Sequence, residues 1–206
     1  MANDDPPKVV LRRSLVMMFW QQPSGKFTRS VNQDKGMMFD ERTTRPAVIE
    51  DAPAIAQVHV ESWKTTYKGI FPKSLLDRLS VSDRTSFWNE TLAKPSARFV
   101  TLVACDEAGR VVGFVCGGAE RTGQLGCDGE LQAMYLLEGV QRQGLGTLLI
   151  RRFVQELRSV GFNSMAVWVL ARNPSRRFYE ALGGSNYRTT DRAWGRIVCG
   201  DCLWLA

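Results

Sequence analysis

The chain has 206 residues, of which 44% are hydrophobic and 23% are charged, the composition of an ordinary globular protein. Its net charge of +6 suits an anionic ligand as well as a polynucleotide, and no long run of like charge favours nucleic-acid binding. The apolar run at residues 15–20 is far shorter than the ~20 residues that a transmembrane helix needs. We therefore expect a soluble, cytoplasmic protein without nucleic-acid or membrane partners, and a homodimer is the one assembly left open.

Residues 1–43 show no sustained hydrophobic periodicity, and Pro6-Pro7 and Pro23 interrupt their short apolar pieces. Such a segment buries too little apolar surface to fold alone. We expect a poorly ordered N-terminal extension over 1–43 and a single domain over 44–206.

The cysteines and the single histidine predict no metal site. The five cysteines fall mostly in apolar, strand-like segments: Cys105, Cys116, Cys127, Cys199 and Cys202. The last two form a lone CxxC, and His59 is far from them in sequence, whereas structural zinc takes four ligands. We interpret the thiols as reduced and His59, beside an apolar helix face, as structural.

The predicted elements alternate in a mixed order. Asp51 is the expected N-cap of a first helix, which Pro53 enters, and Asn173 is the expected N-cap of the last one. Strands are predicted at 45–49, 98–106, 110–117, 131–136, 164–170, 184–192 and 197–205, and further helices at 74–79, 82–92 and from Gly146 to Gly161. This order predicts an α/β (α+β) fold with a mixed, mostly antiparallel sheet of about seven strands flanked by helices.

The segment QRQGLG, residues 141–146, follows a predicted strand and enters a helix that has no obvious side-chain cap. Unpaired amides and the positive end of the helix dipole favour a bound phosphate or pyrophosphate there. The dinucleotide fingerprint GxGxxG fails because Leu149 replaces its third glycine, and a Walker A loop fails because Leu145 replaces its lysine.

The third phosphate-binding pattern, (Q/R)xxGx(G/A), is satisfied by Gln141, Gly144 and Gly146. Four segments occur in the matching order: RPAVIEDAPAIAQVHVESWKTTYKGIFP, GRVVGFV, GELQAMYLLEGVQRQGLGTLLI and NPSRRFYEALGG. On these residues the sequence resembles the GCN5-related N-acetyltransferase (GNAT) superfamily from residue 44 to the C-terminus. The resemblance implies a GNAT-type fold and acetyl-CoA as acetyl donor.

The resemblance also implies which residues contact the cofactor. The pyrophosphate would be held by the turn and the helix entry: Gln141, Arg142, Gln143, Gly144, Leu145, Gly146 and Thr147. The pantetheine arm would pair with the backbone of the preceding strand at Met134, Tyr135 and Leu136, and Asn173 would contact the same region.

Two residues match the catalytic positions of the superfamily. Glu130, at the start of the strand, would be the general base, with Asp128 and Glu120 as alternates, because an amine acceptor must lose a proton. Tyr179 would protonate the departing thiolate, although a tyrosine in this apolar helix also suits the core.

The resemblance therefore implies an N-acetyltransferase in which a primary amine attacks acetyl-CoA directly in a ternary complex. The alternative is a non-catalytic acyl-CoA-binding regulatory module. Residues 166–170 contain no acidic residue, unlike the relatives that acetylate a ribosomal protein. This difference argues against assigning the same substrate to this chain. Trp63, Tyr67 and Phe71 could line an acceptor pocket or pack in the core, and the sequence does not choose.

Overall fold

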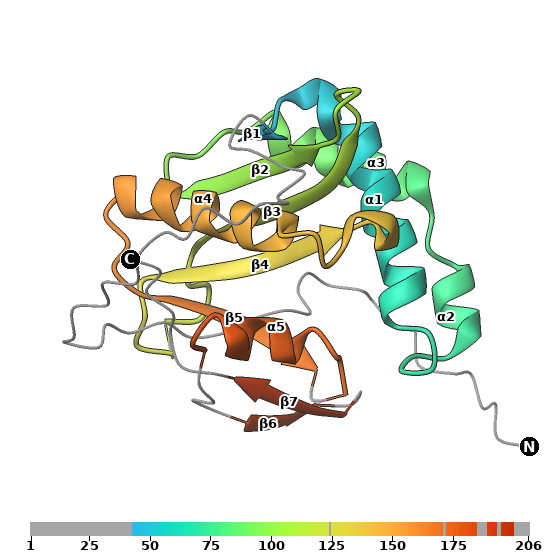
Figure 1. The fold of residues 1–206 in the computed structure, drawn as a ribbon. Coiled ribbons are helices and arrows are strands. Elements are labelled where there is room, and N and C mark those ends of the chain that lie inside the picture. The colour runs from blue at the N-terminus through green and yellow to red at the C-terminus, as the bar shows by residue number, and fades with distance from the viewer. Residues whose placement is uncertain (1–42, 124, 171, 185–188, 193–194, 200–206) are drawn as a thin grey trace, which may run out of the picture.

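The computed structural model describes residues 43–123, 125–170, 172–184, 189–192 and 195–199, the last two ranges through their backbone alone. Seven strands form one sheet in the order β1-β2-β3-β4-β5-β7-β6 (Figure 1). The strands span Thr44–Pro46 (β1), Phe99–Cys105 (β2), Val111–Ala119 (β3), Gly129–Leu136 (β4), Met165–Leu170 (β5), Thr189–Arg192 (β6) and Gly195–Cys199 (β7).

The helices occur between the strands in the predicted places. They span Ala52–Thr66 (α1), Lys73–Asp77 (α2), Val81–Leu92 (α3), Leu145–Ser159 (α4) and Arg176–Ala181 (α5), with short 3-10 turns at Ile49–Asp51 (η2) and Glu138–Val140 (η3). The predicted fold class and strand number are confirmed. Apart from Thr43, the predicted extension lies outside the described residues, as do residues 200–205 of the final predicted strand.

Every pair of neighbouring strands is antiparallel except β4 and β5, which are parallel. This one parallel pair needs a crossover, and α4 supplies it. All six residues of β5 are buried, as expected for a strand that is covered on both faces. The crossover therefore brings the glycine-rich turn and the end of β5 to the same part of the sheet.

Helices cover both faces of the sheet, as alternating residues of β3 demonstrate. The ring of Phe114 packs against His59 of α1 and Trp88 of α3. Gly117 lies three residues after Phe114 and therefore faces the opposite side of the sheet. A Cβ added to Gly117 would lie 2.9 Å from the Phe153 ring of α4. The sheet thus separates an α1–α3 side from an α4 side (Figure 1).

Helix α4 is amphipathic in the way the sequence predicts. Leu145, Leu149, Phe153 and Leu157 recur at helical spacing and are at most 1% exposed. Burying such a side chain contributes roughly 1.5–3 kcal/mol, so this stripe fixes α4 firmly on the sheet. Gly161, with φ of 87°, ends the helix as predicted.

The prediction that Asp51 is the N-cap of α1 is correct in position but not in the bond that a cap makes. Asp51 occupies the N-cap position, but its carboxylate makes no capping bond to α1. It accepts hydrogen bonds from the Arg45 guanidinium at 2.6 and 2.8 Å and from the Val48 amide at 2.9 Å. The preceding turn η2 already leads into α1, so the carboxylate ties β1 to that turn instead.

Candidate active site

The turn between β4 and α4 contains two residues with left-handed backbone. Gly144, the N-cap of α4, has φ of 86°, a conformation that glycine adopts at little cost. Arg142 has φ of 59°, which is uncommon for a residue with a Cβ. The chain thus turns sharply enough to direct the start of α4 back toward the end of β4.

Within the described ranges, the start of α4 lacks a side-chain cap, as the sequence predicted. No side-chain hydrogen bond caps it among the described residues, and its first internal bond runs from the Leu148 amide to the Gly144 carbonyl at 3.0 Å. The amides of Leu145, Gly146 and Thr147 therefore precede the helical bonding pattern. These N–H groups and the helix dipole together favour a bound phosphate group.

The two glutamines of the turn hold its backbone. Gln141 Nε2 donates to the Leu136 carbonyl at 2.9 Å, and Gln143 Nε2 donates to the Gly139 carbonyl at 2.9 Å. Their side chains thus shape the turn, and Arg142, between them, is exposed. Of the three, Arg142 is the side chain available to add positive charge next to a bound anion.

Strands β4 and β5 pair over only three residues and then separate. Their register runs from Gly129↔Met165 to Leu131↔Val167, and within the described residues β5 pairs with β7 from Trp168 onward. The β3–β4 register shifts between Cys116 and Gly117, where the ladder passes from Leu131 to Ala133. Figure 1 shows β4 and β5 diverging toward their carboxyl ends. Among the residues that the structure describes, the second half of β4 therefore has no strand partner on its β5 side.

The side chains of that half point alternately to the two faces. A Cβ on Gly146 would lie 3.4 to 3.5 Å from side-chain atoms of Leu136, Phe178 and Met134, so Met134 and Leu136 face the start of α4. Tyr135 points the other way and is buried against His59. The three residues predicted to pair with the pantetheine arm thus border the gap between the strands.

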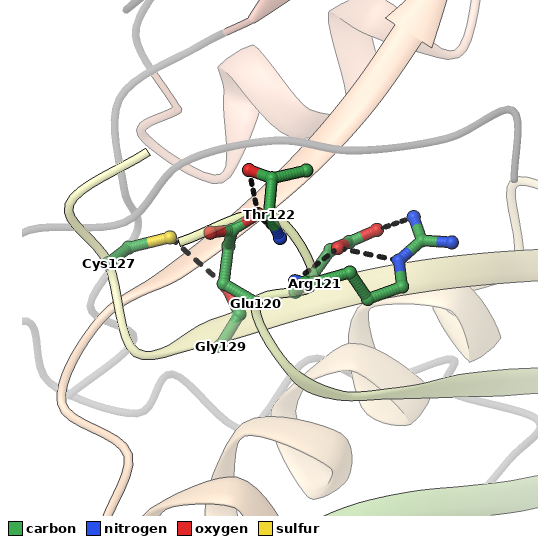
Figure 2. Close-up of polar contacts among 6 residues, drawn as sticks. Glu120, Arg121, Thr122, Cys127 and Gly129 are labelled. Atoms are coloured by element: carbon green, nitrogen blue, oxygen red, sulfur yellow. Dashed lines mark hydrogen bonds and ion pairs between the residues drawn. The ribbon is translucent and has the colours of Figure 1, made fainter. Parts of the chain in front are cut away.

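Glu130 is fully buried and forms an ion pair with Arg121 of the β3–β4 loop. Arg121 Nε donates to Oε2 at 2.8 Å, its Nη2 contacts Oε1, and its backbone amide donates to Oε2 at 3.3 Å. Figure 2 shows Arg121 with these contacts as dashed lines. Burial raises the pKa of Glu130, and Arg121 opposes that rise.

Glu120 and Asp128, the alternate candidates for the general base, both accept hydrogen bonds that order the β3–β4 loop and its surroundings. Glu120 Oε1 accepts from the Thr122 amide at 2.8 Å and hydroxyl at 2.7 Å. Burial alone would raise the pKa of Glu120, but these bonds lower it overall. Asp128 Oδ2 accepts from the Asn163 amide at 2.7 Å. These two carboxylates order the chain around Glu130.

Tyr179 lies on α5 and is 6% exposed. Burial raises its pKa, and neighbouring Tyr67 adds to the rise, so the phenol holds its proton at neutral pH. The Tyr67 and Tyr135 hydroxyls lie 3.3 Å apart. Burial raises the pKa of Tyr67, and its hydrogen bonds to Tyr135 and Asn173 oppose that rise. Residues of α1, β4 and the segment after β5 therefore meet in one buried polar group.

The prediction that Asn173 caps the last helix is wrong in its position. Helix α5 begins at Arg176 with Ser175 as N-cap, and the Asn173 side-chain oxygen accepts from the Ser175 amide at 2.9 Å. This bond closes a turn around Pro174 before the helix starts. The turn leaves Asn173 buried beside Tyr67.

His59 and the aromatic residues of α1 and its exit belong to the core. Burial lowers the pKa of His59 to about 3, which confirms a structural, neutral histidine. Trp63 stacks on Phe71 with ring centroids 6.1 Å apart, and Trp63, Tyr67 and Phe71 are at most 7% exposed. These rings pack against one another, and Tyr67 also joins the polar group through its hydroxyl.

Two features of the site were not predicted. Arg121 lies nine residues before Glu130 across a polar loop, and nothing in the sequence pairs them. Tyr67 and Tyr135 are 68 positions apart and meet only through the packing of α1 on β4.

Within the described ranges, no group of three or more His, Cys, Asp or Glu side chains could hold a metal ion. No helix among those residues is long and apolar enough to cross a membrane.

Comparison with known proteins gives consistent matches. The family model for FR47-like protein matches residues 120–194. The Bacillus subtilis protein named uncharacterized N-acetyltransferase YuaI is 45% identical over 139 residues, which cover 68% of this chain and 78% of that protein.

Among solved structures, three similar ones share the fold at low sequence identity. PaiA N-acetyltransferase from Thermoplasma acidophilum, in complex with coenzyme A, has a TM-score of 0.57 and 19% identity over 75% of this chain and 95% of that one. The ribosomal-protein-alanine N-acetyltransferase from Brucella melitensis has a TM-score of 0.57 and 20% identity over the same shares. YncA from Salmonella typhimurium, with its cofactor acetyl-CoA, has a TM-score of 0.52 and 19% identity over 76% of this chain and 90% of that one.

Proposed function

Because this chain belongs to the GCN5-related N-acetyltransferase superfamily of acyltransferases, we propose that it transfers an acetyl group from acetyl-CoA to a primary amine by direct attack. The observation that carries the proposal is the uncapped start of α4 next to the half of β4 that lacks a β5 partner. The first suits a pyrophosphate, and the second suits an arm that contains amide groups.

The cofactor contacts that we propose use the backbone more than side chains. The amides from Arg142 through Thr147 would hold the pyrophosphate, and the Arg142 side chain would add a positive charge. The backbone of Met134 and Leu136 would pair with the pantetheine arm in place of a strand. Both glutamines of the turn would act indirectly, through the carbonyls that they hold.

Glu130 and Tyr179 would supply the proton transfers. A lysine-type amine has a pKa near 10.4, so most of it is protonated at neutral pH, and Glu130 would accept its proton directly or through water. The amine nitrogen then bonds to the thioester carbon as the carbon–sulfur bond breaks, and its second surplus proton passes to water, which returns a proton to Tyr179 after that residue has protonated the thiolate. Tyr179, which is protonated at neutral pH, would give its proton to the thiolate.

The acceptor that we propose is a small amine, an amino-acid derivative or a protein amino group. The Brucella protein of this fold is named for ribosomal-protein alanine, but Ala166–Leu170 contains no acidic residue to suggest the same acceptor here. A thiol-release assay against a panel of amines, amino acids and N-terminal peptides would identify the acceptor. We also propose that the protein works in the cytoplasm, without a metal ion.

Calorimetric titration of acetyl-CoA tests the cofactor assignment. Gly144→Glu puts a carboxylate against the pyrophosphate, and we expect it to abolish binding. Gly144→Asn is the matched control, because asparagine tolerates left-handed backbone and adds no charge. Gly139→Glu adds the same charge at a glycine with open space around it. Unchanged affinity in Gly144→Glu would reject the site.

One observation favours the alternative, a non-catalytic acyl-CoA-binding regulatory module. The carboxylate of Glu130, the proposed base, is already paired with Arg121. Such a module would bind acetyl-CoA with the same loop dependence but release no thiol with any amine of the panel. Binding and turnover measured on the same preparation therefore separate the two functions.

A further inference from the structure

The β3–β4 loop is built to bring one arginine to the proposed base. Its ends are joined by the Glu120 amide, which donates to the Asp128 carbonyl at 3.0 Å. The Glu120 side chain holds Thr122 through two hydrogen bonds. Arg121 lies between these anchored residues, and both its backbone amide and its guanidinium reach Glu130 (Figure 2). The contact is thus positioned by backbone as well as by side chain.

The surroundings of Glu130 otherwise disfavour a negative charge. Its side chain is 0% exposed, whereas that of Arg121 is 28% exposed. The other ionisable groups near it are the Glu120 carboxylate and the thiols of Cys116 and Cys127, and none of these is a cation. Burial also raises the pKa of each thiol to about 12, so both are neutral. Among the described groups, Arg121 alone favours the carboxylate form of Glu130.

We propose that Arg121 is a positioning residue for the acetyl transfer, one that keeps the buried Glu130 ionised and aimed so that it can accept the proton of the amine. This inference rests on the proposed function. Stability is a weak explanation for the pair, because a buried ion pair contributes little net stability once the desolvation of both charges is counted. A base that must be both desolvated and charged at neutral pH, in contrast, needs a fixed cation next to it.

The pH dependence of kcat/KM separates this role from a structural one. A general base works only when deprotonated, so kcat/KM falls below the pKa of Glu130. Arg121→Gln removes the opposing charge, and we expect this fall to begin about 1–3 pH units higher than in the wild type. Below the raised pKa, kcat/KM of the variant would drop by about tenfold for each further pH unit, and at high pH it would recover.

Three further variants complete the test. Arg121→Lys keeps the charge and should move the profile less, and Glu130→Gln should abolish the fall at acid pH. Arg110→Gln removes an exposed arginine that pairs with Asp106, and its profile should match the wild type. An unchanged profile in Arg121→Gln, or an equal loss at every pH, would overturn the positioning role.

A second readout keeps the inference testable if no amine is acetylated. The side-chain carboxyl carbon of Glu130 can be titrated by NMR in wild-type and Arg121→Gln protein, assigned with Glu130→Gln. We expect the pKa of Glu130 to rise in Arg121→Gln, and an equal pKa in the two proteins would overturn the inference. Suppose that no amine is acetylated but the pKa of Glu130 is raised in Arg121→Gln. This result would reject the transferase function and leave the electrostatic role of Arg121 in place.

Discussion

The indole Nε1 of Trp88 donates a hydrogen bond of 3.4 Å to Nδ1 of His59. This bond joins α3 to α1 on the side of the sheet opposite α4. The acceptor nitrogen must be unprotonated for this bond to form. Tyr135 stacks on the same ring, with centroids 5.2 Å apart, and His59 is 8% exposed. The imidazole is thus held neutral by burial and by its partner, and Arg84 nearby also disfavours a second proton.

This relationship predicts a loss of stability in mild acid. The unfolded chain binds a proton at histidine near pH 6.5, whereas folded His59 does so only near 3, so acid favours the unfolded state between these values. From pH 6.5 to 5 the free energy of unfolding should fall by about 2 kcal/mol from this residue. His59→Gln keeps an acceptor for Trp88 and cannot titrate. Urea unfolding at both pH values should therefore show a smaller fall in the variant, and an equal fall would contradict the prediction.

The carboxylate of Asp51 should matter far more than its exposed counterpart on α2. Asp51→Ala leaves the Val48 amide and the Arg45 guanidinium without their acceptor, which should cost about 1–3 kcal/mol. Asp77→Ala breaks an exposed pair with Lys73 and should change stability by less than about 1 kcal/mol. Denaturant melts of the two variants compare them directly. Equal effects would mean that the Asp51 contacts contribute little.

The two glycines of the phosphate turn should respond differently to alanine. Gly144→Ala forces a Cβ into left-handed backbone and should destabilise the protein by about 1–2 kcal/mol. At Gly146 an added Cβ would meet Leu136, Phe178 and Met134 at 3.4 to 3.5 Å, ordinary contact distances. Gly146→Ala should therefore be neutral or stabilising, since alanine favours helix. Thermal unfolding distinguishes them, and the reverse order would refute this interpretation of the turn.

Loss of the Tyr179 hydroxyl should affect turnover without affecting binding. In the proposed mechanism Tyr179→Phe removes the acid that protonates the thiolate, and kcat should fall by about 10²–10⁴. Acetyl-CoA affinity, measured by calorimetry, should stay the same because the ring remains in place. Tyr67→Phe is the control, since Tyr67 bonds to Tyr135 inside the polar group. Wild-type kcat in Tyr179→Phe would show that this tyrosine only packs.

The sequence predicted those parts of the molecule that depend on local pattern. The path from β4 through the turn into α4 was predicted closely, because apolar periodicity and the glycines at 144 and 146 are both local signals. The Asn173 cap failed because the side chain had a second local choice, a turn over Pro174 that delays the helix to Arg176. Sequence spacing does not choose between two bonds of similar energy.

Contacts between segments distant in sequence could not be predicted, because they depend on tertiary packing. Glu130 was predicted as a base from its place on the strand, but its ion pair depends on how the β3–β4 loop folds back. The hydroxyl contact of Tyr67 with Tyr135 depends on the rotation of α1 against the sheet. Neither is encoded by a period or a motif, so the electrostatics of the site required the structure.

In the part of the chain that the structure describes, the separation of β4 from β5 leaves one edge of a central strand unpaired inside the molecule. An open edge on the surface of a protein invites a strand from another chain and so promotes aggregation. Here the edge lies between strands of the same sheet, with α4 and α5 close by, where a second polypeptide chain would have to displace whole helices (Figure 1). The slender arm of the proposed cofactor would therefore reach an edge that the surrounding helices protect from association with another chain.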